Sequence, residues 1–218
     1  MRLAVWILTV CSYAGVFAGA LVTSAVQAEE VQIRQLEAIQ LYTQDELLAL
    51  IQTNSHLRRV QDDDCQLVRD IEARADIMKL PAYQFLWGDM LAYAVCVPRD
   101  IERGWQLMQD AAAQGLPAGL EQVGRYYHIG RFVQPDERKA IIYLREAAAL
   151  GHVPATIRLA DILLADAGSP RDYEQVYRWL HHSVTADNST HQKIADLLRQ
   201  FEQRMPERVV LRAREPVR

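Results

Sequence analysis

The chain has few of the residues from which catalytic and metal sites are usually built. Among its 218 residues there are only three cysteines, six histidines and ten glycines. It contains no glycine-rich phosphate loop, no Gly-x-Ser-x-Gly nucleophile turn and no His-Glu-x-x-His zinc helix. The adjacent His181 and His182 would point about 100° apart on a helix, which suits a shared metal ion poorly. We therefore predict that the protein is not an enzyme and has no catalytic residue, cofactor or metal.

A surplus of basic charge is absent as well. Lysine and arginine number 24 against 28 aspartates and glutamates, which gives a formal net charge of −4 at pH 7. Nucleic-acid binding usually depends on a basic patch, and so we expect no nucleic-acid partner. The three aspartates at 62–64 lack the glycine and the distal glutamate of an EF-hand loop. We interpret them as the acidic N-terminus of a helix.

Long apolar runs are missing except at the start of the chain, where Leu3–Val22 follows Arg2. Small residues at positions 26 and 28 complete the pattern of a secretory signal peptide over residues 1–28, with cleavage after Ala28. The alternative is an uncleaved anchor, since the run is nearly long enough to cross a bilayer. After cleavage, no membrane span is expected.

What the chain does have is a repeat of 36 residues. Asp136–Gly151 is predicted to form one helix, with Asp136 as N-cap and Gly151 as the left-handed residue after the last turn. The equivalent stretch Asp100–Gly115 lies 36 residues earlier. The same spacing relates the predicted N-caps and the small residues of the first helices: Asp64, Asp100, Asp136 and Asp172; Gly88, Gly124 and Ala160. Such a period indicates stacked helix–turn–helix units.

The repeat phase divides the chain into segments. We expect an N-terminal arm and helix in residues 29–63, the repeat array in residues 64–187, a closing helix in residues 188–204 and a mobile basic tail in residues 205–218. Before the array, a capping-box pattern predicts a helix over residues 43–52. Within the array we predict helices over residues 65–79, 82–94, 101–114, 118–129, 137–150, 154–166 and 173–186. Gly124 should lie where the two helices of one repeat cross.

Two cysteines, Cys65 and Cys96, remain after Cys11 is removed with the signal peptide. An even number in an exported protein favours a disulfide over a reactive thiol. If the repeats are in register, neighbouring second helices start at the same end of the array, about 8–10 Å apart. We therefore predict a Cys65–Cys96 bond.

The second full repeat resembles the Sel1-like repeat, an α/α solenoid module related to tetratricopeptide repeats (TPR). The residues that carry the resemblance are Ala118, Val123, Gly124, Tyr127, Gly130, Asp136, Ala140, Tyr143, Leu144, Ala147, Ala148 and Gly151. The resemblance implies an all-α fold, an α/α solenoid of about three and a half Sel1-like repeats with a capping N-terminal segment and a C-terminal helix.

Longer phrases, at residues 65–75, 80–83, 168–174, 177–180 and 202–206, resemble a more specific family of periplasmic proteins from sodium-driven polar flagellar motors. This resemblance implies a structural component of a ring around the basal body that helps recruit and anchor stator units and is needed for rotation. Its expected partners are a MotY-like ring protein and the periplasmic region of the stator B subunit. The expected location is the periplasm, at the flagellar basal body. The alternative is a periplasmic adaptor or regulator that binds another exported protein.

A partner-binding surface is predicted around the turn of the second full repeat. Arg125, Tyr126, Arg131 and Phe132 combine aromatic with guanidinium groups, the types enriched at interface hot spots. A solvated helix end is the alternative. Trp105 occupies a repeat position and is expected to be buried.

Overall fold

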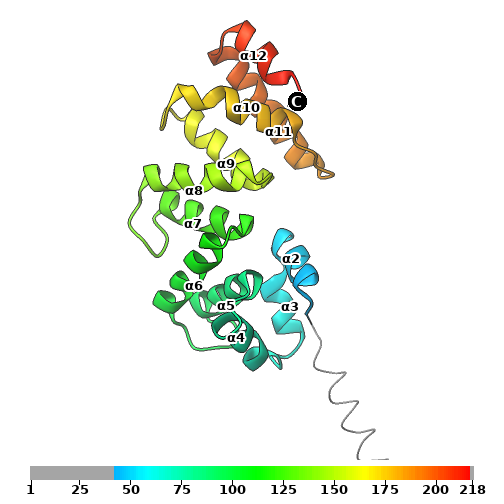
Figure 1. Ribbon diagram of the computed structural model, residues 1–218, viewed down its shortest axis with the longest axis vertical. Helices are drawn as coiled ribbons and strands as arrows, with labels where there is room; N and C mark the ends of the chain where they lie inside the picture. Colours follow the sequence, from blue (N-terminus) through cyan, green and yellow to red (C-terminus); the bar gives the residue numbers. More distant parts are fainter. Residues whose placement is uncertain (1–41, 217–218) are drawn as a thin grey trace, which may run out of the picture. The chain divides into compact units, whose positions relative to one another are not determined.

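Every regular element between residues 42 and 216 is helical in the computed structural model, which describes those residues. The fold is therefore the all-α solenoid that was predicted. The predicted signal peptide at 1–28 and the arm up to residue 41 lie outside the described residues. Within the unit Gln44–Arg218, each helix from α5 to α10 packs against the next one in the chain (Figure 1).

The phase of the repeat is visible in how its helices begin. The carboxylates of Asp100 and Asp136 each accept a backbone N–H from the residue three positions on, at 3.0 Å, which confirms both caps. Pro81 and Pro117 occupy the first turn of the other helices, where a backbone N–H is not needed. The resulting pairs are α5 (Pro81–Tyr93) with α6 (Ile101–Ala113), α7 (Pro117–Ile129) with α8 (Glu137–Ala149), and α9 (Val153–Leu164) with α10 (Tyr173–His182).

The two helices of a repeat approach each other closely at a glycine. A Cβ atom on Gly124 would lie 2.8 Å from Cγ of Leu144 in α8. A Cβ atom on Gly88 would lie 2.8 Å from the carbonyl oxygen of Gly104 in α6. Gly124 therefore faces its partner helix, as predicted. The contact of α5 with α6 tolerates a larger residue less well, because the nearest atom there belongs to the backbone rather than to a side chain.

Of the other two predicted caps, Asp64 is wrong, whereas Asp172 occupies the N-cap position of α10 but makes no capping bond with its side chain. Asp64 has a left-handed backbone with φ of 53°, and it lies in the turn after α3 (His56–Asp62) rather than directly before a helix. Asp172 ends the 3₁₀ turn η1 (Pro170–Asp172), and its Oδ2 accepts a hydrogen bond from Arg145 at 2.5 Å instead of capping α10. Both aspartates stand where the chain departs from the regular repeat.

The segment before the first full repeat also differs from the prediction. α2 (Gln44–Gln52) confirms the helix expected from the capping box, but α3 was not predicted. The half repeat is shorter than expected, since α4 covers Val68–Asp76. The aspartates at 62–64 end α3 instead of beginning the next helix, and Asp63 accepts a hydrogen bond from Arg59 at 3.0 Å. With seven residues, α3 is too short to show a helical period in the sequence.

The turn after α3 is joined covalently to the loop after α5. Cys65 and Cys96 form a disulfide with their Cα atoms 5.5 Å apart, which is the pairing predicted from the sequence. Cys65 has a φ of 60° and does not begin a helix. The bond therefore links two loops, and it ties α3 and α4 to the first full repeat.

The C-terminal end is closed by two helices rather than one. The predicted closing helix is present as α11 (Asn188–Arg204), whose buried residues are Ile194, Leu197 and Phe201. Residues after Pro206 were expected to form a mobile tail, but they form α12 (Glu207–Arg214) and bury Val210 and Ala213. Nε of Arg212 donates to Glu174 of α10 at 2.7 Å, so the basic charge is partly neutralised by α10.

Candidate binding surface

The residues predicted to bind a partner lie on α7 and on the loop that follows it. Tyr126 is fully buried (0% exposed), which removes it from the candidate contact residues. The guanidinium of Arg125 lies 4.7 Å from the centre of the Tyr126 ring. The burial of Tyr126 was not predicted, because a helix in a repeat array packs against neighbours on several faces. More of its positions are therefore buried than a single apolar stripe indicates.

Phe132 and Arg131 approach the same ring from the loop. Phe132, with a left-handed φ of 64°, packs edge-on against Tyr126 at 5.2 Å between ring centres. The Arg131 guanidinium lies 5.0 Å from the ring of Tyr93 in α5. The structure thus brings all four predicted residues into one cluster, of which Arg131 is the exposed member. Trp105, expected to be buried, is half-buried and packs edge-on against Tyr127.

A buried polar network lies behind this cluster. Nε2 of His56 in α3 is 2.8 Å from Oδ2 of Asp89 in α5, and Nε2 of Gln122 in α7 donates to the other oxygen of Asp89 at 3.0 Å. The same amide nitrogen donates to the hydroxyl of Tyr126 at 2.7 Å. Burial, followed by the negative charge of Asp89, raises the pKa of Tyr126 far above its usual range. The Tyr126 hydroxyl also lies 2.5 Å from that of Tyr93 in α5, so it is a neutral structural group that joins α5 to α7.

On the other side of Arg125 the chain forms a groove of about 270 Å³, lined by parts of α7, α9 and the α2–α3 turn. Oε1 of Glu121 accepts a hydrogen bond from Nε of Arg158 at 3.0 Å, and Nε of Arg125 lies 3.7 Å away. One carboxylate therefore faces two guanidinium groups. This leaves an excess of positive charge in a partly desolvated hollow, which favours an anionic group from a ligand.

His152 lines the same groove, at the start of α9. Burial lowers its pKa below the ordinary histidine range, and the nearby Glu121 offsets only part of that effect. Its Nδ1 is buried without a hydrogen-bond partner among the described residues. At neutral pH His152 therefore adds a neutral polar group beside the two arginines and contributes no positive charge of its own.

The groove residues were not predicted from the sequence, although a signal for them was present. At the position occupied by Glu121, the equivalent residues 36 positions away are Phe85 and Ile157, both apolar. At the position of Arg158 the equivalents are Leu86 and Gln122. A charged residue where the other repeats have uncharged ones is not required by the repeat, and it marks a surface with another role.

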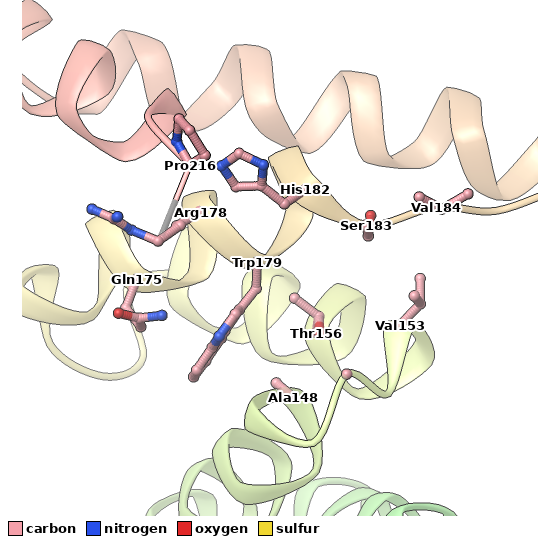
Figure 2. Close-up of a pocket in the computed structure, with 11 residues that line it drawn as sticks. Ala148, Val153, Thr156, Gln175, Arg178, Trp179, His182, Ser183, Val184 and Pro216 are labelled. Carbon is pink, nitrogen blue, oxygen red and sulfur yellow. The ribbon is translucent and has the colours of Figure 1, made fainter. Parts of the chain in front are cut away.

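A second hollow, of about 480 Å³, lies at the C-terminal ends of α8 and α10. Figure 2 shows Trp179 extending from α10 toward Ala148, with Thr156 of α9 beside it and Val153 farther along, near Val184. Val184, just after α10, is 92% exposed at the rim. The indole packs against the core and also presents one face to the hollow, so this site offers an apolar surface.

Metal-binding clusters and membrane-spanning helices are both absent from residues 42–216. Across residues 42–216 no group of three or more histidine, cysteine or acidic side chains is placed to hold a metal ion. His181 and His182 face each other edge-on at 4.9 Å between ring centres. Among the same residues, no helix combines the length and apolar character needed to cross a bilayer.

Comparison with known proteins gives the same architecture. The Sel1 repeat family model matches residues 81–116, 117–152 and 153–182, which are the three helix pairs. The fold resembles a Sel1 repeat protein from Oxalobacter formigenes, with a TM-score of 0.54 and 20% identity over 59% of this chain and 97% of the other. The fold also resembles a protective antigen of uropathogenic Escherichia coli with an SLR fold. The TM-score is 0.50 and the sequence identity is 22%, over 62% of this chain and 28% of the other. These likenesses establish the fold.

Two sequence relatives are more informative. An uncharacterised protein of Neisseria meningitidis is 31% identical over 54% of this chain and 24% of its own length. The sodium-type polar flagellar protein MotX of Vibrio parahaemolyticus is 57% identical over 176 residues, which are 81% of this chain and 83% of that protein. Identity at this level over most of both sequences reaches beyond the repeats that the two chains share. The chain therefore belongs to the MotX family of sodium-type polar flagellar proteins.

Proposed function

We propose that this component of a sodium-type flagellar motor is a periplasmic structural protein of the ring around the basal body. In this role it recruits and anchors the sodium-driven stator units, and it does so by being held between partners rather than by turning over a substrate. The observation that carries the proposal is the 57% identity to MotX over most of both chains.

The construction of the helical array is consistent with bearing a mechanical load. Neighbouring helices are joined at close glycine contacts, at the buried Asp89 network and by the Cys65–Cys96 bond. The glycine contacts join the two helices within a pair, whereas the bond from Gln122 to Asp89 joins α7 to α5, so force applied to one helix pair is passed to the next. A rigid array of this kind can hold a stator unit in place, whereas a chain of independent modules would yield at its linkers.

Deletion of the gene in its own bacterium tests the proposal. We expect cells with normal flagellar filaments that do not swim, and fluorescently tagged stator units that no longer gather at the flagellated pole. A plasmid carrying the wild-type gene should restore both properties. Normal swimming after deletion, or the absence of filaments, would contradict a role in stator anchoring.

The two partners are assigned to different parts of the chain. The Sel1 match begins at residue 81, so residues 29–79 are the least repeat-like part, and we propose that they meet the MotY-like ring protein. The later repeats would face the periplasmic region of the stator B subunit. A photo-crosslinking residue at the exposed position of Arg58 in α3 should capture the ring protein, and one at Arg138 in α8 should capture the stator subunit. The reverse pattern would overturn this assignment and leave the motor role intact.

A further inference from the structure

Three neighbouring hollows, which share lining residues around the N-terminal half of α9, are treated together as one groove. Between the arginine-lined groove and the Trp179 hollow lies a third depression, of about 450 Å³. It shares Pro154 and Arg158 with the first hollow, and Val153 and Val184 with the second. Because the lining residues are shared, an extended chain could pass from one hollow to the next without leaving the surface.

One end of this groove is cationic. Arg125 and Arg158 share the single carboxylate of Glu121, and Arg158 contacts it through its Nε. Within residues 42–216, Nη1 and Nη2 of Arg158 have no hydrogen-bond partner, although the side chain is only 33% exposed. Two partly desolvated nitrogens on a planar guanidinium match the two oxygens of a carboxylate.

The other end of the groove has mainly apolar lining, although Gln175, Arg178 and His182 also line it. Val184 is 92% exposed, and Trp179 and Val153 are only partly covered. Exposed apolar and aromatic side chains beside a cationic site suit a ligand that carries both an acid and an apolar side chain. An inorganic anion would use only the arginines and would leave the apolar end uncovered.

We propose that the groove binds an extended acidic peptide segment of another protein. A carboxylate of the segment would lie against Arg158 and Arg125, and an apolar side chain further along would cover Val184 and Trp179. This inference depends on the groove alone and does not require that the partner be a motor protein.

Fluorescence anisotropy with the purified full-length chain, freed of its predicted signal peptide, tests the proposal. The probe is a panel of fluorescein-labelled decapeptides with blocked ends. Each peptide has one Asp-Glu pair and one leucine in a glycine–serine background, and the panel covers every possible distance between the pair and the leucine. At least one spacing should bind with a Kd below about 1 mM. The same peptide with Asn-Gln in place of Asp-Glu should bind at least about tenfold more weakly.

Two variants and a matched control locate the binding site. Arg158→Gln should weaken binding of the acidic peptide about tenfold or more and abolish the preference for acid over amide. Val184→Asp should also weaken it, without a change in melting temperature, because that side chain is almost fully exposed. Arg199→Gln, a change of the same type on the surface of α11, should bind like the wild type.

Three results would overturn the proposal. The first is that no peptide of the panel binds, and the second is that acidic and amide peptides bind equally well. The third is that Arg158→Gln and Val184→Asp both bind like the wild type. Phosphatidylglycerol vesicles serve as a second probe, and binding to vesicles without binding to any peptide would assign the arginines to a lipid surface instead.

Discussion

The two ends of the helical array are closed by different means. At the N-terminal end, α3 and α4 are held by a disulfide and by the buried pair of His56 and Asp89. At the C-terminal end, α11 supplies a long apolar face, and α12 is held on α10 by ion pairs at the surface, such as Arg212 with Glu174. Covalent and buried polar links therefore predominate at the N-terminal end. Buried apolar side chains and solvent-screened ion pairs predominate at the C-terminal end.

Helix length explains the difference. α3 has seven residues and α4 has nine, whereas α11 has seventeen, and the eight-residue α12 packs on α10 with Val210 and Ala213 buried. A short helix is marginal by itself and buries few side chains, so specific links must compensate for the lost conformational entropy. A long amphipathic helix obtains the same stability from its apolar face. We therefore expect substitutions to lower the free energy of unfolding strongly at the N-terminal end and only slightly at the C-terminal end.

Removing the disulfide should have the largest effect. Cys65→Ser combined with Cys96→Ser frees a loop with a sequence separation of 31 residues, which should lower the free energy of unfolding by about 3–4 kcal/mol. Urea unfolding followed by circular dichroism measures the change. The wild type in reducing agent serves as the control and should match the double variant. Two alkylated thiols in the unreduced wild-type protein would contradict the bond itself.

Removing the buried carboxylate of Asp89 should rank second. Asp89→Ala leaves Nε2 of His56 without its partner and takes one acceptor from Gln122, both of them buried. Unsatisfied buried groups make this substitution cost about 2–3 kcal/mol. Asp89→Asn, which keeps the shape and one acceptor oxygen, should recover part of the loss. If Asp89→Ala unfolds at the same urea concentration as the wild type, the network does not stabilise this end.

Substitutions at the helix crossings should have an effect on stability that is intermediate between those at the two ends. Gly124→Leu forces a large side chain against Leu144 and should cost about 1–3 kcal/mol. Gly124→Ala should be milder, because Leu144 can shift and because Ala160 occupies the equivalent position in α9. Gly88→Ala should cost more than Gly124→Ala, since its Cβ would meet the backbone oxygen of Gly104. Equal melting temperatures for the two alanine variants would contradict this ranking.

Substitution of Glu174 at the C-terminal end should have the smallest effect. Hydrogen bonding from Arg212, together with the charges of Arg212 and Arg178, lowers the pKa of Glu174. A carboxylate with a lowered pKa contributes stability above its unfolded pKa of about 4.3 and loses it as pH falls through the folded value. Glu174→Gln should therefore cost less than about 1 kcal/mol at pH 7, because solvent screens exposed pairs.

The acid dependence of this last variant distinguishes the two ends further. Below the ordinary glutamate range the difference between Glu174→Gln and the wild type should disappear, because the wild-type carboxylate is then protonated. Melting curves at pH 7 and at acidic pH measure it, with Arg199→Gln as an exposed control. If Glu174→Gln lowered the melting temperature at pH 7 more than Asp89→Ala does, the comparison between the two ends would be reversed.

Local features account for what could be predicted. The capped helices after Asp100 and Asp136 and the cysteine pair were recognised because each depends on residues close in sequence or on a fixed period. α3 and α12 were missed, since each has eight residues or fewer and buries only two side chains. Their helical form depends on α5 and α10, which lie elsewhere in the chain.

The same distinction applies to the candidate site. Arg125 and Phe132 were selected by residue type, but their sequence could not show that Tyr126 between them is buried. Glu121 and Arg158 are separated by 37 positions and meet only because α7 and α9 are stacked.

The sequence by itself determined the period, the two regular caps, the small residues at the helix crossings and the family, because these depend on backbone hydrogen bonding and on residue size at fixed intervals. Only the tertiary structure decided which faces remain open and which charges share a partner. Burial and pairing are set by neighbours that stacking brings from one repeat to the next, and no local pattern specifies them.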